Sequence, residues 1–379
     1  MMGRALFQYV LLLMSVFVIG GCAATNNNEE EAEEHRNNDV STEQVAPDND
    51  FNEKTAFLKI VDTEVIATNL DVPWAIAKVD DTFFVTERAG TIAVIENGEV
   101  TREQVVTEAP VLHHAEGGLL GFVLHPEFQQ NQLAYLYHTY ESDERILNRV
   151  ILAERTNGGW IERDVLLDDI PGANFHNGGR MIIGPDEHLY LGLGDASIPE
   201  LSQDNSSIAG TIIRMTLEGA IPEDNPFSNS FIYSYGHRNP QGLVWDEAGN
   251  TLYSSEHGPR AHDEINRIEP GQNYGWPIIY GDETTTGMEP PLFHSGTDTW
   301  APSGMTYVEG FLYVAGLRGN AVFGFDVAGE REQVVWQSPD RIRDIYFDGD
   351  ALYIITNNKD GRGNPSGNDD RLIRLVYQN

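Results

Sequence analysis

A short pattern of two apolar strands around a polar turn recurs along the chain. Each copy begins with an apolar strand, turns at an acidic residue or a glycine, and continues with a second strand rich in Leu, Tyr and Val before a polar loop. This pattern predicts a β-hairpin in every copy. Long helical periodicity is absent throughout. The copies lie at residues 74–85, 121–137, 179–191, 242–253, 303–314 and 343–353.

The number and spacing of the copies predict the fold. They recur at intervals of about 40 to 60 residues, which suits four-stranded blades with insertions. Six copies therefore predict an all-β, six-bladed β-propeller over residues 54–379, with residues 58–61 as the outer strand that closes the last blade. A large β-sandwich is the competing fold, but it does not need the same hairpin six times. Loops at one end of a propeller converge, so distant motifs can share one pocket.

The first residues have the pattern of a bacterial lipoprotein leader. Arg4 precedes an apolar run from Ala5 to Ile19 that is short for a membrane span, and Gly20 and Gly21 stand before Cys22. We expect residues 1–21 to be a signal peptide and Cys22 to be the lipidated mature N-terminus, on a membrane surface outside the cytoplasm. A plain signal peptide with an incidental cysteine is the alternative. Cys22 is the only cysteine, so disulfides are excluded.

Residues 22–53 and the overall charge limit the possible partners. This segment is rich in Asn, Glu, Asp and Ser and lacks the apolar content needed to offset ordering entropy, so we expect a disordered acidic tether. The chain has 59 acidic and 24 basic residues and a formal net charge of −35. Such a charge argues against nucleic acid and anionic lipid as partners.

A histidine and an aspartate flank the third hairpin. His176 stands just before its first strand, and Asp195 follows its second strand. The two ends of an antiparallel hairpin are adjacent, so these side chains can reach hydrogen-bond distance. An aspartate that binds one imidazole nitrogen leaves the other as a general base. A structural His–Asp pair that caps a blade is the simpler alternative.

Several arginines occupy the loops that are predicted to converge. Arg238 precedes the fourth hairpin beside Asn239, Arg318 follows the fifth, and Arg341 and Arg343 open the last. In a chain with few basic residues, such a set predicts an anionic ligand in the channel. The Gly-rich turn at a helix N-terminus that is typical of phosphate sites is absent. An inter-blade salt bridge is the alternative role for Arg238.

A loop after the fourth hairpin suggests a hard cation. The Gly258-Pro259 turn can present two carbonyl oxygens, and Glu264 adds a carboxylate, which are ligands that calcium prefers. Zinc is not expected, because no cysteine is available and the loop histidines lack a helical metal spacing. The simplest interpretation of those histidines is ordinary polar loop residues, at His113, His114, His257 and His262.

Taken together, these phrases resemble the soluble quinoprotein glucose/sorbosone dehydrogenase family, also called aldose sugar dehydrogenases. The resemblance extends from about residue 57 to 377, and its specificity lies in the order and combination of the motifs. The matching segments are 117–121, His176 with 179–180, 194–195, 236–242, 256–259, 263–266, 274–277 and 341–344.

The resemblance implies a propeller that binds pyrroloquinoline quinone and calcium and oxidises aldose sugars at C1 to lactones. His176 would take the C1 hydroxyl proton while hydride passes to the quinone, and Asp195 would orient His176. Arg238 and Asn239 would contact the quinone near its reactive carbonyls. Arg341 and Arg343 would pair with the carboxylates of the cofactor, and Arg318 stands where the family tends to place a lysine.

The resemblance also implies two calcium ions. The carbonyls of Gly258 and Pro259 would hold the calcium that polarises the quinone. Glu264 and the carbonyl of Tyr274 would bind a second, structural calcium. The cofactor would then perform the redox step while the protein orients and polarises it.

Two positions depart from the family pattern. Glu116 stands where members with glucose activity tend to have Gln, and it would either repel an acidic quinone or bind sugar hydroxyls. Phe175 replaces a polar sugar contact that some members carry, so we expect a different sugar preference. The insertions that build a dimer interface are not evident, so we expect a monomer that passes electrons to an acceptor the sequence does not identify.

Two other functions fit a propeller of this kind. A calcium-dependent lactonase would need a cluster of Asp, Asn and Glu around a channel metal, whereas this chain places arginines there. A sugar-binding propeller without catalysis is the other alternative, because a fold alone does not prove activity.

Overall fold

The hairpins expected from the repeat are all present in the computed structural model of the protein, which describes residues 56–329 and 331–378. Each hairpin is antiparallel and supplies two neighbouring strands of a sheet. The strand pairs are β2 (Pro73–Val79) with β3 (Thr82–Glu87), β6 (Leu119–Leu124) with β7 (Leu133–Ser142), β10 (Met181–Ile183) with β11 (His188–Leu193), β14 (Pro240–Asp246) with β15 (Thr251–Glu256), β18 (Pro302–Val308) with β19 (Phe311–Gly316), and β22 (Ile342–Phe347) with β23 (Leu352–Thr356).

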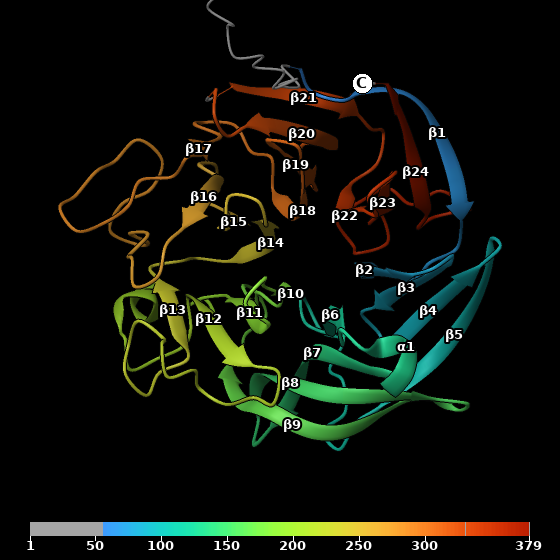
Figure 1. The fold of residues 1–379 in the computed structure, drawn as a ribbon, viewed down its shortest axis with the longest axis horizontal. Helices are drawn as coiled ribbons and strands as arrows, with labels where there is room; N and C mark the ends of the chain where they lie inside the picture. Colours follow the sequence, from blue (N-terminus) through green and yellow to red (C-terminus); the bar gives the residue numbers. More distant parts are fainter. Residues whose placement is uncertain (1–55, 330, 379) are drawn as a thin grey trace, which may run out of the picture. The chain divides into compact units, whose positions relative to one another are not determined.

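Two further strands extend each hairpin outward. These are β4 (Thr91–Glu96) and β5 (Glu99–Val106), β8 (Arg145–Thr156) and β9 (Gly159–Pro171), β12 (Thr211–Thr216) and β13 (Ile232–Tyr235), β16 (Glu264–Ile268) and β17 (Phe293–His294), β20 (Ala321–Asp326) and β21 (Arg331–Gln337), and β24 (Leu372–Gln378) with β1 (Lys59–Ala67). The sheets stand around a common centre with the first strand of each hairpin innermost (Figure 1). The predicted all-β propeller class is confirmed.

The number of blades depends on how one sheet is divided. The described strands form four sheets of four strands and one sheet of eight. The eight-stranded sheet has a parallel junction in its middle, where Val105 and Val106 of β5 pair with Trp160 and Ile161 of β9. Six four-stranded units are obtained when this sheet is divided at that junction.

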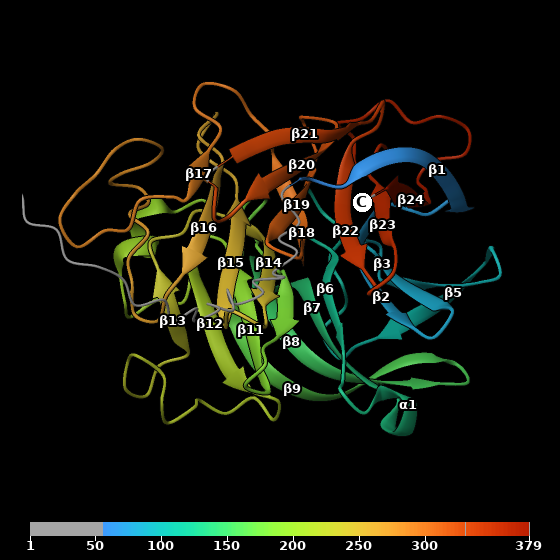
Figure 2. The same ribbon diagram turned by 45° about the horizontal axis from the view of Figure 1, so that its top comes forward.

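The two ends of the described chain share one sheet. β1 lies at the outer edge and pairs antiparallel with β24, from Lys59 opposite Gln378 to Ala67 opposite Leu372. The predicted closing strand at residues 58–61 is therefore present, and it extends further than expected. Figures 1 and 2 show β22 of this sheet beside β2 of the first, so the ring closes there.

Aromatic side chains pack the interior between the two four-stranded halves of the eight-stranded sheet. Trp160 is fully buried, and its ring lies 6.0 Å from that of Phe84 and 5.5 Å from that of Phe122, both edge to face. Phe128, in the short helix α1 (Phe128–Asn131), stacks on Trp160 at 6.0 Å. Large buried rings contribute strongly to core stability. They hold the two halves of this sheet, and with them their loops, in fixed relative positions.

The remaining regular element is a single turn of 3-10 helix at Pro199–Gln203. Among the residues that the structure describes, no helix is long and apolar enough to cross a membrane. The predicted signal peptide, lipidated Cys22 and acidic tether at residues 1–53 lie outside the described residues.

Candidate functional site

A cavity of about 310 Å³ lies at the open ends of the hairpins. Residues that precede the first strand of a hairpin and residues that follow its second strand meet at this end. Segments far apart in sequence therefore line one wall. The polar and aromatic lining consists of Trp74, Arg88, Glu116, Phe175, Asn177, Gln241, His257, Arg343, Asp360 and Arg362.

His176 and Asp195 meet beside this cavity. His176 Nδ1 is 2.7 Å from Asp195 Oδ1, and Asp195 is fully buried. The same carboxylate accepts hydrogen bonds from Trp276 Nε1 at 2.9 Å and from the Ser197 backbone N–H at 2.8 Å. An ionised carboxylate can only accept, so Nδ1 carries the proton and Nε2 is left as an acceptor. This is the geometry of an oriented general base.

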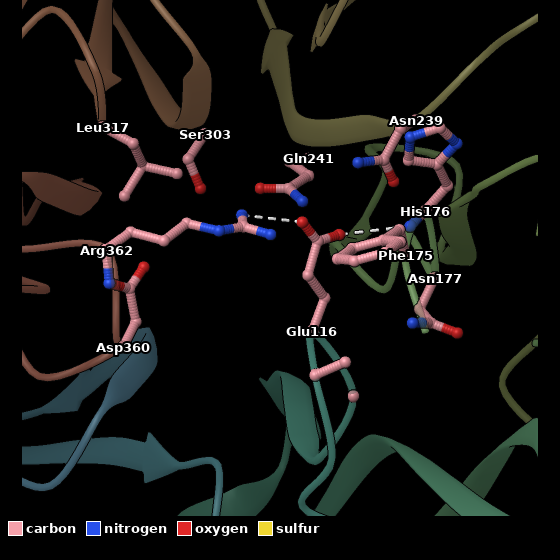
Figure 3. Close-up of polar contacts among 12 residues, drawn as sticks. Glu116, Phe175, His176, Asn177, Asn239, Gln241, Ser303, Leu317, Asp360 and Arg362 are labelled. Carbon is pink, nitrogen blue, oxygen red and sulfur yellow. Dashed lines mark hydrogen bonds and ion pairs between the residues drawn. The ribbon is translucent and has the colours of Figure 1, made fainter. Parts of the chain in front are cut away.

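Glu116 holds the backbone of His176. The His176 N–H donates to Glu116 Oε2 at 3.1 Å, and Arg362 Nη1 lies 2.7 Å from Glu116 Oε1 (Figure 3). Burial alone would raise the pKa of Glu116, but Arg362 and the His176 N–H more than offset it, so the pKa lies below its usual value. His176 has φ +62°, a left-handed conformation that non-glycine residues rarely adopt. Glu116 therefore supports a strained residue at the candidate base.

Arg343 places an incompletely paired cation in the cavity wall. Its Nη1 donates to Gln241 Oε1 at 2.9 Å, and its Nη2 is 3.9 Å from Asp360 Oδ2. Its Nε is buried without a hydrogen-bond partner among the described residues. Burial lowers the pKa of Arg343 to about 9, and repulsion from Arg88 and Arg341 adds to this effect. An anionic ligand would offset both the burial of the Arg343 charge and its repulsion from the other arginines.

Arg88 is the second buried cation of the wall. Its guanidinium donates to the backbone carbonyls of Gly117, at 2.7 Å from Nη2, and of Ala115. Burial lowers its pKa, although Asp360 and Glu116 offset part of the shift. Carbonyls carry no formal charge, so the positive charge of Arg88 is not neutralised by its hydrogen-bond partners.

The arginines expected in one channel are divided in the structure. Of the four, only Arg343 lines the main cavity. Arg318 and Arg341 line a neighbouring cavity of about 210 Å³, where Arg341 pairs with Asp360 at 2.9 Å. Arg362 lines both cavities and lies between the two groups.

Arg238 and Asn239 lie behind the wall. The Arg238 guanidinium is 5.3 Å from the Trp276 ring centre, and its Nη1 donates to the His257 carbonyl at 3.0 Å. Asn239 is buried and accepts the N–H of Gly178, a lining residue, at 3.1 Å. In this structure both residues position the wall rather than line it.

The residues expected to bind calcium fall into two sets. Gly258 and Pro259 are half-buried in a turn that Asp263 holds through the Gly258 N–H, at 3.0 Å. Glu264 and Tyr274 are buried and do not line the cavity. Within residues 56–329 and 331–378, no three His, Asp or Glu side chains are grouped closely enough to hold a metal by themselves. Any calcium bound there would need carbonyl oxygens, as the prediction assumes.

Glu264 nevertheless has the character of a metal ligand. Burial raises the pKa of Glu264 to about 8, and nearby Glu256 adds to the shift. Its Oε1 accepts one backbone N–H, from Gly281 at 3.0 Å. Asn266 Oδ1 beside it is buried and has no hydrogen-bond partner in the described part of the chain. A buried carboxylate and an unpaired amide oxygen fit a hard cation.

Sequence reasoning missed several lining residues, chiefly Arg88, Gln241, Asp360 and Arg362. It also treated His257 as an ordinary loop histidine, whereas the structure places it in the cavity wall. Burial lowers the pKa of His257 to about 4. Arg88 and His257 each directly follow the second strand of a hairpin. That shared position is the signal that could have identified them.

Residues 70–374 match the model of the glucose/sorbosone dehydrogenase family. This match covers most of the chain. The chain belongs to the glucose/sorbosone dehydrogenase family.

Individual relatives agree with this assignment. An aldose sugar dehydrogenase of Escherichia coli is 30% identical over 79% of this chain and 91% of that protein. Quinoprotein glucose dehydrogenase B of Acinetobacter calcoaceticus is 35% identical, but the match spans 60% of this chain and only 54% of that protein. The solved PQQ-bound aldose sugar dehydrogenase of Streptomyces coelicolor is 36% identical with a TM-score of 0.78, covering 85% of this chain and 98% of that one. The expectation of an oxidoreductase is confirmed at the level of the family.

Proposed function

We propose that the protein oxidises aldose sugars at C1 to lactones, using pyrroloquinoline quinone and calcium. The observation that carries this proposal is the His176–Asp195 pair, 2.7 Å apart, beside a cavity whose wall holds buried arginines. A base and a cation-lined cavity are what a reaction needs when a proton leaves a sugar hydroxyl next to an anionic cofactor. Membership of a sugar dehydrogenase family supports the same reaction.

The described residues fit the cofactor. Pyrroloquinoline quinone carries carboxylates and, when bound, supplies a quinone that accepts two electrons. Arg343 and Arg88 are buried cations without full charge compensation, and both line the cavity. The neighbouring arginines, Arg318 and Arg341, extend the cationic region. Together they would hold the carboxylates.

The chemistry assigned to the chain is proton transfer. His176 Nε2 accepts the proton of the sugar C1 hydroxyl, while Asp195 stabilises the imidazolium that forms. Trp276 and Ser197 hold the Asp195 carboxylate in place. Arg238 and Asn239 remain the proposed partners of the quinone carbonyls, and they would reach it through small rearrangements of the wall.

We also propose both calcium sites. The carbonyls of Gly258 and Pro259 would hold the ion that polarises the quinone. Glu264, with the carbonyl of Tyr274, would hold a structural ion, and the buried, incompletely paired Glu264 carboxylate supports this second site.

The location and partners are further parts of the proposal. A lipid on Cys22 would tether the enzyme to a membrane surface outside the cytoplasm, where a separate acceptor takes its electrons. We propose a monomer that binds no nucleic acid, and the charge of −35 supports the latter.

Reconstitution tests the proposal. Metal-free apoprotein mixed with the quinone and calcium should reduce a dye acceptor when aldoses are added. His176→Ala should remove most turnover and leave quinone binding largely intact. His125→Ala is the matched control, because His125 lies at the turn end of the β6–β7 hairpin. Absence of saturable quinone binding in the presence of calcium would exclude the dehydrogenase reaction.

The same assay judges the alternatives. Hydrolysis of a lactone without the quinone would support the lactonase. Sugar binding without dye reduction by the fully loaded protein would support a propeller that only binds sugars.

A further inference from the structure

We infer that Glu116 and Arg362 act together at the site. Glu116 positions His176, and Arg362 neutralises the negative charge that Glu116 brings into the cavity. The inference rests on the proposed function, because it concerns the same base and the same anionic cofactor. Arg362 was not among the residues expected at the site.

The two side chains join segments that are far apart in sequence. Glu116 precedes β6, and Arg362 belongs to the loop between β23 and β24. Figure 3 shows the Arg362 guanidinium directed at one Glu116 oxygen and the other oxygen directed at His176. The guanidinium carbon also lies 5.8 Å from the ring centre of Phe175, the residue next to His176. One ion pair therefore contacts the segment of the base twice.

Glu116 acts on the backbone of His176 and not on its imidazole. Its Oε2 accepts the His176 N–H at 3.1 Å, and this residue has φ +62°. A rarely populated backbone conformation persists only where neighbouring contacts enforce it. An uncharged amide oxygen at the same place could make the same hydrogen bond. Positioning therefore requires the acceptor oxygen but not the charge.

Arg362 acts on the charge. The side chain of Arg362 is 52% exposed and that of Glu116 is 23% exposed, so the pair contributes little to folding stability. In the cavity, however, Glu116 and Asp360 oppose Arg88, Arg343 and Arg362. With Arg362 present, the wall keeps one net positive charge. Without it, the wall would carry no net charge, and the Glu116 carboxylate would lose its ion-pair partner beside an anionic cofactor.

A double-mutant cycle separates the two roles. Arg362→Gln should raise the Kd of the quinone for apoprotein with calcium about tenfold, which is about 1.4 kcal/mol. Glu116→Gln should bind at least as tightly as the wild type. The double variant Glu116→Gln/Arg362→Gln should return to within about threefold of it, because both charges are gone. The Kd is measured by quenching of tryptophan fluorescence. Arg362→Lys should keep most of the affinity.

A surface ion pair of the same kind is the control. Arg163 pairs with Glu154 at 2.6 Å, and these side chains are 46% and 36% exposed. Arg163→Gln should not change the Kd. If the double variant binds as weakly as Arg362→Gln, or if all variants bind alike, charge compensation by Arg362 is refuted.

The positioning role has a readout that needs no cofactor. In the NMR spectrum of histidine-labelled apoprotein, the His176 imidazole signal, assigned with His176→Ala, should shift in Glu116→Ala and stay near its wild-type position in Glu116→Gln. Equal spectra for Glu116→Ala and the wild type would refute this role. Failure of the wild type to bind the quinone would instead refute the proposed function, and the spectra would still judge the positioning of His176.

Discussion

Replacing Asp195 by Asn tests how the candidate base is activated. Asp195 is fully buried and accepts three hydrogen bonds. Oδ1 receives His176 Nδ1 and the Ser197 N–H, and Oδ2 receives Trp276 Nε1. An asparagine has one acceptor oxygen, and we expect this oxygen at the Oδ1 position, where the His176 and Ser197 donors converge. Its NH₂ group then faces the Trp276 N–H, so two donors oppose each other.

The magnitude follows from this arrangement. The amide oxygen still accepts the Nδ1 proton of His176, so the tautomer is kept and the loss comes from the missing negative charge. Two unit charges about 4 Å apart interact by roughly 4 kcal/mol at an effective dielectric of about 20. If about two thirds of this attraction between the Asp195 carboxylate and the imidazolium acts in the transition state, its loss lowers kcat about 100-fold. The opposed donors should lower the free energy of unfolding by about 1–3 kcal/mol.

A second substitution separates the two effects. Trp276→Phe removes the opposing N–H, so Asp195→Asn/Trp276→Phe should recover stability relative to Asp195→Asn without recovering kcat. Denaturant unfolding gives the first quantity, and dye reduction at saturating quinone, calcium and sugar gives the second. The reasoning fails if Asp195→Asn keeps kcat within a few-fold of the wild type, or if the double variant is no more stable than Asp195→Asn.

Three further predictions test local features. A Cβ at Gly194 would overlap the carbonyl oxygen of His176, so Gly194→Ala should lower the midpoint of thermal unfolding and abolish dye reduction. Gly367 has open space around it, so Gly367→Ala should change neither quantity. Chelation of calcium should lower the midpoint of thermal unfolding of the wild type. Glu264→Gln should remove that response, because a neutral amide lacks the charge of the carboxylate ligand. An unchanged response to calcium in Glu264→Gln would contradict the proposed calcium site. Burial raises the pKa of Asp370 to about 6 from 3.8. The contribution of Asp370 to stability is therefore full below about pH 3.8 and is lost as the pH rises through about 6. The unfolding free energy of the wild type relative to Asp370→Asn should fall across that window. A constant difference between the two proteins would show that the pKa shift is absent.

The fold could be predicted because its signal is local and repeated. Each inner hairpin has its own alternating strands and turn, and the repeat located all of them, from β2–β3 to β22–β23. The pairing of β5 with β9 could not be foreseen. Two residues on each strand make this parallel junction, and pairing between distant edge strands leaves no periodicity in the sequence.

The site was predictable only where a hairpin fixed its geometry. His176 and Asp195 flank one hairpin, and the structure brings them into contact. Arg362 lies in a long loop, and its partner Glu116 is 246 positions away, so no spacing rule relates them. The division of the arginines between two cavities depends on where Asp360 and Arg362 fall, and both belong to that same loop. Long loops depend on tertiary contacts that sequence patterns do not specify.

The charge distribution explains why the cations of the cavity need to be buried. The chain has a formal charge of −35, which repels an anionic ligand from a distance. Exposed charges are screened beyond about 10 Å at ordinary ionic strength, whereas buried charges are screened much less. Arg88 and Arg343 are withdrawn from water, where burial lowers the pKa of both. Their attraction therefore acts at short range, inside the cavity, where it can outweigh the surrounding acidic surface. Binding of the proposed anionic cofactor would therefore depend on the wall and not on the overall field.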